Sequence, residues 1–234
     1  MTTPFLAFIR AVIDGEVADV SRRLSDAPAL ATMTSDEGAS REQASTFFFS
    51  EISHYLYAGD TALHMAAAAF RREVAKLLIA SGADCRARNR RGAEPLHYAA
   101  DANHWDPVAQ AETIAYLLTA GADPNAVDGS GVAPLHRAVR TRSLAAVRAL
   151  LDGGAKVGQR NKGGSTPLHL AVQTTGRGGS GAPEARDQQE AIVRLLLERG
   201  AQPTDRDGHG KTVDQAASTE RVRAVLREMR TPGR

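Results

Sequence analysis

Apolar side chains recur along this chain at helical spacing, in short blocks separated by polar segments. Val74, Leu77 and Leu78 would share one face of a helix, and residues 192–196 repeat the arrangement. Each block ends at a glycine, which suits the left-handed conformation that closes many helices. The pattern predicts helix pairs at about residues 65–80, 96–119, 135–152, 168–198 and 213–227.

Two short motifs alternate along the chain, and their spacing defines a module. The first runs from glycine to histidine, and its copies end at His64, His97, His136 and His169, with a weaker copy ending at Gln215. The second joins a leucine pair to Gly-Ala, with its glycine at Gly82, Gly121, Gly154 and Gly200. Successive histidines are 33, 39 and 33 residues apart. The module is therefore 33 residues long, and two copies carry insertions of 6 and 13 residues.

The start of the module suits the first turn of a helix. Pro95, Pro134 and Pro167 each lie two residues before the motif histidine, where a missing N–H costs nothing, and Thr166 is a good N-cap. With these motifs the chain resembles the ankyrin repeat family over about residues 59–227. The resemblance implies an all-α solenoid of about six helix-turn-helix repeats with hairpin-like fingers. It also implies that the motif histidines hydrogen-bond to backbone near the fingers.

We expect a single domain over residues 1–234, in which the outer repeats act as caps with one polar face. Its expected parts are a degenerate N-terminal cap repeat (1–33), an aromatic-containing insertion (34–58), repeats two to five (59–91, 92–130, 131–163 and 164–209) and a C-terminal cap repeat (210–234).

The insertion at residues 34–58 holds nearly half of the aromatic residues. Segments 46–49 and 54–57 are expected to pair as a short hairpin around residues 50–53. Two interpretations stay open. The insertion folds onto its own neighbours, or Phe48, Tyr55 and Tyr57 form a contact surface, since aromatic side chains are common interface anchors.

Two other insertions fall inside repeats. The six-residue insertion near residues 103–107 is expected to lengthen the connection between two helices, and it holds Trp105, a further candidate contact residue. Residues 174–186 are rich in glycine and read as a flexible loop. This loop lacks the lysine-serine end of a phosphate-binding loop, and its place in a repeat explains it without a nucleotide.

Composition narrows the function further. No apolar run reaches the length of a membrane span, and no signal peptide is evident at the start. Cys85 is the only cysteine, which favours a reducing, cytoplasmic location. The histidines lack metal-ligand spacing and no catalytic signature is present, so we expect no enzyme activity, metal or cofactor.

The unusual feature is the arginine content of the fingers and first helices. In a solenoid such positions line one concave face, where the family binds partners. Candidate partner-binding arginines are Arg86, Arg88, Arg90, Arg137, Arg140 and Arg160. The alternative, which stays open, is that these arginines are solvated surface residues of an arginine-rich chain.

We expect a monomeric protein-binding module of the adaptor, inhibitor or immunity type. Its partner is a protein of unknown identity, with an acidic surface as one option. The alternative is an anionic polymer or nucleic acid bound along the arginine-rich fingers, which the net charge of only +2 disfavours.

Overall fold

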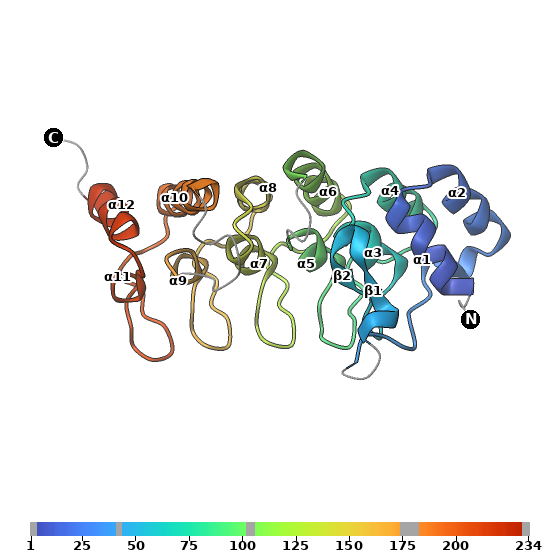
Figure 1. The fold of residues 1–234 in the computed structure, drawn as a ribbon, viewed down its shortest axis with the longest axis horizontal. Helices are drawn as coiled ribbons and strands as arrows, with labels where there is room; N and C mark the ends of the chain where they lie inside the picture. The colour runs from blue at the N-terminus through green and yellow to red at the C-terminus, as the bar shows by residue number, and fades with distance from the viewer. Residues whose placement is uncertain (1–3, 41–43, 102–105, 174–182, 231–234) are drawn as a thin grey trace.

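The chain forms an elongated stack of helix pairs. The computed structural model describes residues 4–40, 44–101, 106–173 and 183–230. First helices form one row, second helices form another, and the loops between pairs project as fingers beyond the first row (Figure 1). The pairs are α1 (Pro4–Asp14) with α2 (Val17–Asp26), α3 (Ala62–Ala68) with α4 (Arg72–Ala80), α5 (Pro95–Ala99) with α6 (Pro107–Thr119), α7 (Pro134–Arg140) with α8 (Leu144–Asp152), α9 (Pro167–Ala171) with α10 (Pro183–Glu198), and α11 (Val213–Ala216) with α12 (Glu220–Arg230).

Each motif histidine is the third residue of a first helix, and its ring connects that repeat to the next one. In each case the ring Nδ1 accepts a backbone N–H three residues earlier, while Nε2 lies within hydrogen-bond distance of a carbonyl oxygen in the following finger. The Nδ1 contacts join His64 to Thr61, His97 to Glu94, His136 to Ala133 and His169 to Thr166, at 3.1–3.3 Å. The Nε2 contacts reach the carbonyl oxygens of Ala93, Val132, Ser165 and Lys211, at 3.0–3.3 Å. The expectation that these histidines bind backbone near the fingers is confirmed.

Neighbouring fingers are also joined directly through their backbones. The N–H of Gly129 donates to the carbonyl oxygen of Arg91 at 2.8 Å, and that of Gly208 donates to Gly163 at 2.9 Å. Arg90 to Ala58 and Lys162 to Ser130 are the corresponding bonds in the other fingers, at 3.2 and 3.3 Å. Because each finger is held by its predecessor, the fingers project in a common direction and present one continuous face.

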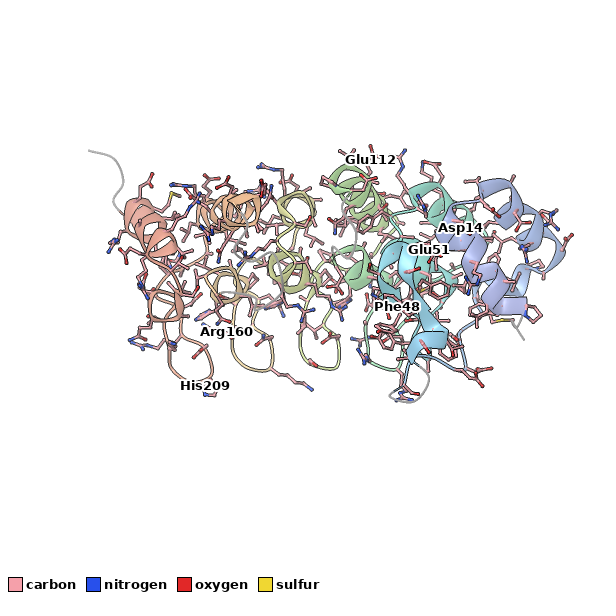
Figure 2. The ribbon with its side chains drawn as sticks, in the orientation of Figure 1. Asp14, Phe48, Glu51, Glu112, Arg160 and His209 are labelled. Carbon is pink, nitrogen blue, oxygen red and sulfur yellow. The ribbon has the colours of Figure 1, made fainter. Side chains whose placement is uncertain are left out.

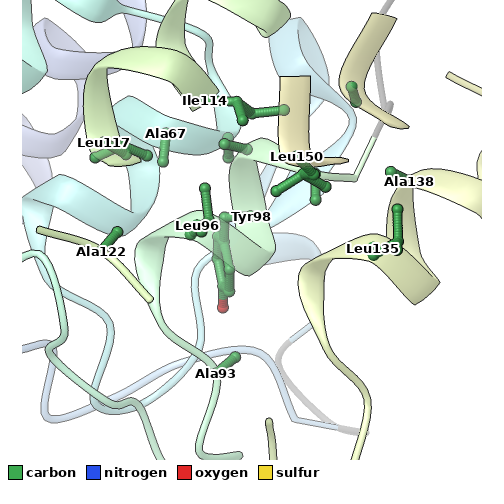
Figure 3. Packing of buried hydrophobic residues seen from close by; sticks show 14 of the residues in the cluster. Ala67, Ala93, Leu96, Tyr98, Ile114, Leu117, Ala122, Leu135, Ala138 and Leu150 are labelled. Atoms are coloured by element: carbon green, nitrogen blue, oxygen red, sulfur yellow. The ribbon is translucent and has the colours of Figure 1, made fainter. Parts of the chain in front are cut away.

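Apolar side chains from both rows fill the space between the helices. Leu96, Ile114, Leu117 and Leu135 are fully or almost fully buried, and alanines between them allow close approach of the backbones (Figure 3). Tyr98 lies at the edge of this cluster, with its hydroxyl turned away from the apolar side chains (Figure 3). The apolar body of this residue therefore belongs to the core, while its polar end faces the finger side.

The glycines after the second helices have the expected left-handed conformation. Their φ angles are 97° at Gly82, 99° at Gly121, 91° at Gly154 and 93° at Gly200. A side chain would be strained there, so glycine ends the helix without cost.

The two insertions inside repeats differ from their expected form. Helix α6 has 13 residues where α4 and α8 have 9, so the six-residue insertion extends a helix as well as a connection. Asp106 caps that longer helix by accepting the N–H of Ala109 at 3.0 Å. The loop expected at residues 174–186 is wrong at its C-terminal end, because α10 already begins at Pro183 and has an acidic residue, Glu184, in its first turn. Residues 174–182 lie outside the described part of the chain.

The buried histidines predict a loss of stability in mild acid. Burial, together with the charge of Arg137, lowers the pKa of His97 from 6.5 to about 4. The unfolded chain therefore takes up a proton on this ring at higher pH than the folded chain does. The stability that His97 contributes is present above pH 6.5 and is lost as the pH falls from 6.5 towards 4.

We expect the His97→Gln variant to lose about 2 kcal/mol less unfolding free energy than the parent between pH 7 and pH 5. Gln215 already fills the corresponding place in the last pair, where its Oε1 accepts the N–H of Thr212 at 2.9 Å. Urea denaturation at both pH values measures the difference. Equal losses of unfolding free energy in the parent and the variant would contradict the lowered pKa of His97.

Candidate partner-binding groove

A groove of about 1300 Å³ opens between the fingers and the first helices of the stack. Its walls come from the finger between α4 and α5, the finger between α6 and α7, helices α5 and α7, and the hairpin of the insertion. We call this feature the concave groove. Its charged lining residues are Arg88, Arg90, Arg91, Arg137, Arg140, Lys162, Asp101 and Asp128.

The insertion supplies the aromatic wall of the groove. Strands β1 (Phe48–Phe49) and β2 (His54–Tyr55) pair antiparallel, with Phe48 opposite Tyr55, and one 3₁₀ turn, Ser50–Ile52, joins them. The expected hairpin is confirmed, although its strands are shorter than segments 46–49 and 54–57. In the view of Figure 1 it is drawn in front of α3.

One face of this hairpin is buried and the other is partly exposed, and each face bears on one of the two interpretations of the insertion. Phe47, Phe49, Ile52 and Leu56 are at most 3% exposed, so this half folds onto its neighbours as the structural interpretation requires. Phe48 is 40% exposed and its ring lies 4.8 Å from that of Tyr55, measured between centroids. The second interpretation, a contact surface formed by Phe48, Tyr55 and Tyr57, stays a prediction.

A buried carboxylate, Asp60, fixes the hairpin to the repeats. Asp60 has no exposed surface. Its oxygens accept hydrogen bonds from the Tyr98 hydroxyl at 2.8 Å, the Asn89 side-chain amide at 2.8 Å and the Tyr57 backbone N–H at 2.7 Å. Burial and the nearby carboxylate raise the pKa of Tyr98, so the phenol keeps the proton that it donates. The ring of His54 lies 4.6 Å from that of Tyr98, measured between centroids, so the hairpin packs against α5.

A second charged cluster, centred on Arg137, forms the floor of the groove. The guanidinium of Arg137 binds Asp101 at 2.7 Å and Asp128 at 2.9 Å, and its side chain is only 14% exposed. Although burial opposes it, the two carboxylates raise the pKa of Arg137. Arg140 lies 3.7 Å from Asp101 and is half exposed. Arg137 is thus neutralised by protein carboxylates, while Arg140 stays open to solvent.

Three of the predicted arginines bind finger backbone. The Nε of Arg86 donates to the Gly121 carbonyl oxygen at 2.8 Å, and Arg88 donates to the carbonyl oxygens of Gly92 and Val127. Arg160 holds the next finger in the same way and also pairs with Asp205 at 3.1 Å. Arg160 lies on a finger towards the C-terminal end of the stack (Figure 2).

The concave groove therefore gathers part of the predicted set. It brings together Tyr55, Tyr57, Arg88, Arg90, Arg137 and Arg140, whereas Arg86 and Arg160 do not line it. Phe48 packs on Tyr55 beside it, and Trp105 lies outside the described residues. That these residues bind a partner stays a prediction.

The predicted site left out Arg91, Lys162, His54, Asp101 and Asp128, all of which line the groove. A positional signal was available for one of them, Asp101. Tyr98 and Arg137 both directly follow a motif histidine, and Asp101 and Arg140 both lie four residues after one. The positions one and four residues after a motif histidine therefore supply polar residues to the groove.

The groove exposes polar and aromatic groups together. Its exposed groups are guanidinium and ammonium donors beside phenol rings, and Arg91 lies 4.0 Å from the centroid of the Tyr57 ring. Among residues 4–40, 44–101, 106–173 and 183–230, no group of three or more His, Cys, Asp or Glu side chains is arranged to hold a metal ion. Burial raises the pKa of Cys85, whose thiol donates to the Ala120 carbonyl oxygen.

Within the same described residues, no helix has the length and apolar character required to cross a bilayer. The family model described as ankyrin repeats (3 copies) matches the chain at residues 41–110 and 108–207, which is well over half of its length. A search of the curated proteins finds no match.

Removing the Asp60 carboxylate should weaken both the fold and the groove wall. Asp60→Ala leaves the Tyr98 hydroxyl and the Asn89 amide buried without their acceptor, so we expect a loss of about 3 kcal/mol in unfolding free energy. Tyr98→Phe removes one donor only and should cost about 1.5 kcal/mol. Asp36→Ala, an exposed acid of the same insertion, is the control and should change stability by no more than about 0.5 kcal/mol. Equal effects of Asp60→Ala and Asp36→Ala in urea denaturation would contradict this role.

Proposed function

The chain belongs to the ankyrin repeat family, and we propose that it is a non-enzymatic protein-binding module that recognises its partner through the concave groove. Members of this family are generally protein–protein interaction modules. One observation supports the concave groove as the binding face. The groove combines exposed arginines with tyrosine side chains on a rigid support, and aromatic residues and arginine are enriched in protein interfaces.

The support is pre-organised, which favours tight binding because little freedom remains to be lost. The hairpin is anchored by buried phenylalanines and by Asp60, and each finger is hydrogen-bonded to its neighbour. A partner would therefore meet a surface whose backbone is already in place. We assign the chain to the adaptor, inhibitor or immunity type on this basis, acting as a monomer in the cytoplasm.

We interpret the helix pairs as six repeats. The first and last are caps, because α2 and α12 bury one apolar stripe each and leave charged side chains outside. Residues 34–58 then form an insertion between repeats one and two, and this insertion builds the aromatic wall.

An anionic polymer lying along the fingers is less well supported. Such a ligand requires a continuous track of available cations. Arg86, Arg88 and Arg160 direct their guanidinium groups to finger carbonyl oxygens, and Arg206 does the same towards Gly210. These finger arginines therefore do not form a continuous track of available cations.

Site-specific photo-crosslinking tests the binding face. A benzophenone amino acid at Tyr55 should capture a host protein that the same group at Tyr116 does not capture. Tyr116 is a matched control, because it is also a half-buried tyrosine but lies on α6, in the row of second helices.

Charge reversal gives an independent measure of the same face. Arg90→Glu with Arg140→Glu should weaken binding of the captured protein by more than about 1 kcal/mol, which is about fivefold. Arg148→Glu with Arg186→Glu is the control, since both arginines are exposed on second helices. Capture from Tyr116, or equal loss of binding in the control pair, would contradict recognition through the concave groove.

A further inference from the structure

The concave groove carries more positive charge than the whole chain. Six cationic side chains and two carboxylates line it, which is a formal charge of +4. The chain as a whole has a formal net charge of +2, so the remaining residues sum to −2. The field of the molecule is therefore positive at the groove and slightly negative elsewhere, and this pattern steers an anionic ligand to one place.

Four of these cations keep hydrogen-bond donors for a ligand. The Arg90 side chain is exposed and has no ion-pair partner in the described part of the chain. Arg91 stacks one face on Tyr57, which leaves the edge of its guanidinium open. Within the described residues, the ion pair of Arg140 is the 3.7 Å contact with Asp101, a carboxylate already bound by Arg137. Lys162 uses one donor, to the Gly129 carbonyl oxygen at 2.6 Å.

These four cations and the two carboxylates come from different segments of the groove lining. Arg90 and Arg91 belong to the finger before α5, whereas Arg140 ends α7 and Lys162 belongs to the finger after α8. Asp101 and Asp128 occupy the floor, held by Arg137. A phosphate chain carries charge at every residue, so it would meet these two carboxylates as well as the cations. A polypeptide can place acidic side chains beside the cations and uncharged ones beside Asp101 and Asp128.

The aromatic wall favours the same kind of ligand. The rings of Tyr55 and Tyr57 lie 6.1 Å apart between centroids and line the groove beside Arg91. An apolar side chain of a polypeptide can pack on these rings while its acidic neighbours meet the guanidinium groups.

We propose that the occupant of the concave groove is an extended acidic segment of a partner protein, which presents carboxylate side chains to Arg90, Arg91, Arg140 and Lys162. This inference rests on the proposed function and adds the chemistry of the partner. Carboxylates fit these sites because guanidinium groups bind them through paired hydrogen bonds.

An array of defined peptides tests this with the full chain as the labelled probe. Each peptide is about twelve residues long and carries a Leu-Trp pair flanked by glutamates at every spacing. Each has a twin with glutamine in place of glutamate. A phosphoserine series and a single-stranded oligothymidine of equal charge complete the set. We expect a subset of glutamate peptides to bind at least about tenfold more tightly than their glutamine twins and than the oligonucleotide.

The variants of the chain decide where that binding occurs. Arg90→Glu with Arg140→Glu should reduce the affinity for those peptides by about tenfold or more, while Arg148→Glu with Arg186→Glu should change it by less than about twofold. Equal binding of the glutamine twins, tighter binding of the phosphoserine peptides or oligonucleotide, or equal loss in both variant pairs would overturn the proposal. Equal binding of the twins, with crosslinking from Tyr55 retained, would reject the acidic chemistry alone. Loss of selective crosslinking from Tyr55 would reject the proposed function as well.

Discussion

The buried carboxylate of Asp60 is the constraint on which the shape of the concave groove depends. A carboxylate without exposed surface must be surrounded by donors, because an unmatched buried charge is costly. Its three donors come from three segments, which are the insertion at Tyr57, a finger at Asn89 and a first helix at Tyr98. Satisfying one side chain therefore brings the hairpin, the finger and α5 together. The aromatic wall is in this sense a consequence of one hydrogen-bond requirement.

Around that point, the regular part of the stack supplies a support with little freedom. Buried histidines link each first helix to the next finger, and backbone hydrogen bonds link finger to finger. These links do not use the side chains that face the groove. Residue types at those positions can therefore differ between repeats without loss of the backbone hydrogen bonds. Tyr98, Asp101, Arg137 and Arg140 are such variations, and together with the hairpin they turn a uniform solenoid face into a charged groove.

The repeat positions of the histidines and glycines were predictable because each meets a local requirement, either a helix start or a left-handed turn. The hairpin was also predictable, from its aromatic segments. The pairing of Arg137 with Asp101 and Asp128 was not, since its partners lie 36 and 9 residues away and meet only when repeats stack. Arg86, Arg88 and Arg160 looked like free surface charges because a sequence does not reveal which guanidinium groups find a carbonyl oxygen. The N-terminal parts of α6 and α10 were not predicted as helix, because insertions within a repeat were expected to lengthen loops.

The most direct test of this account is hydrogen exchange of the chain with and without the host protein captured from Tyr55. Binding in the concave groove should slow exchange at residues 53–57, 88–93 and 127–140, which hold most of its lining. Helices α6, α8 and α10 should be unaffected, since their outer faces point away from the fingers (Figure 1). Protection confined to α6, α8 and α10, with residues 53–57 and 88–93 unchanged, would contradict recognition through this groove.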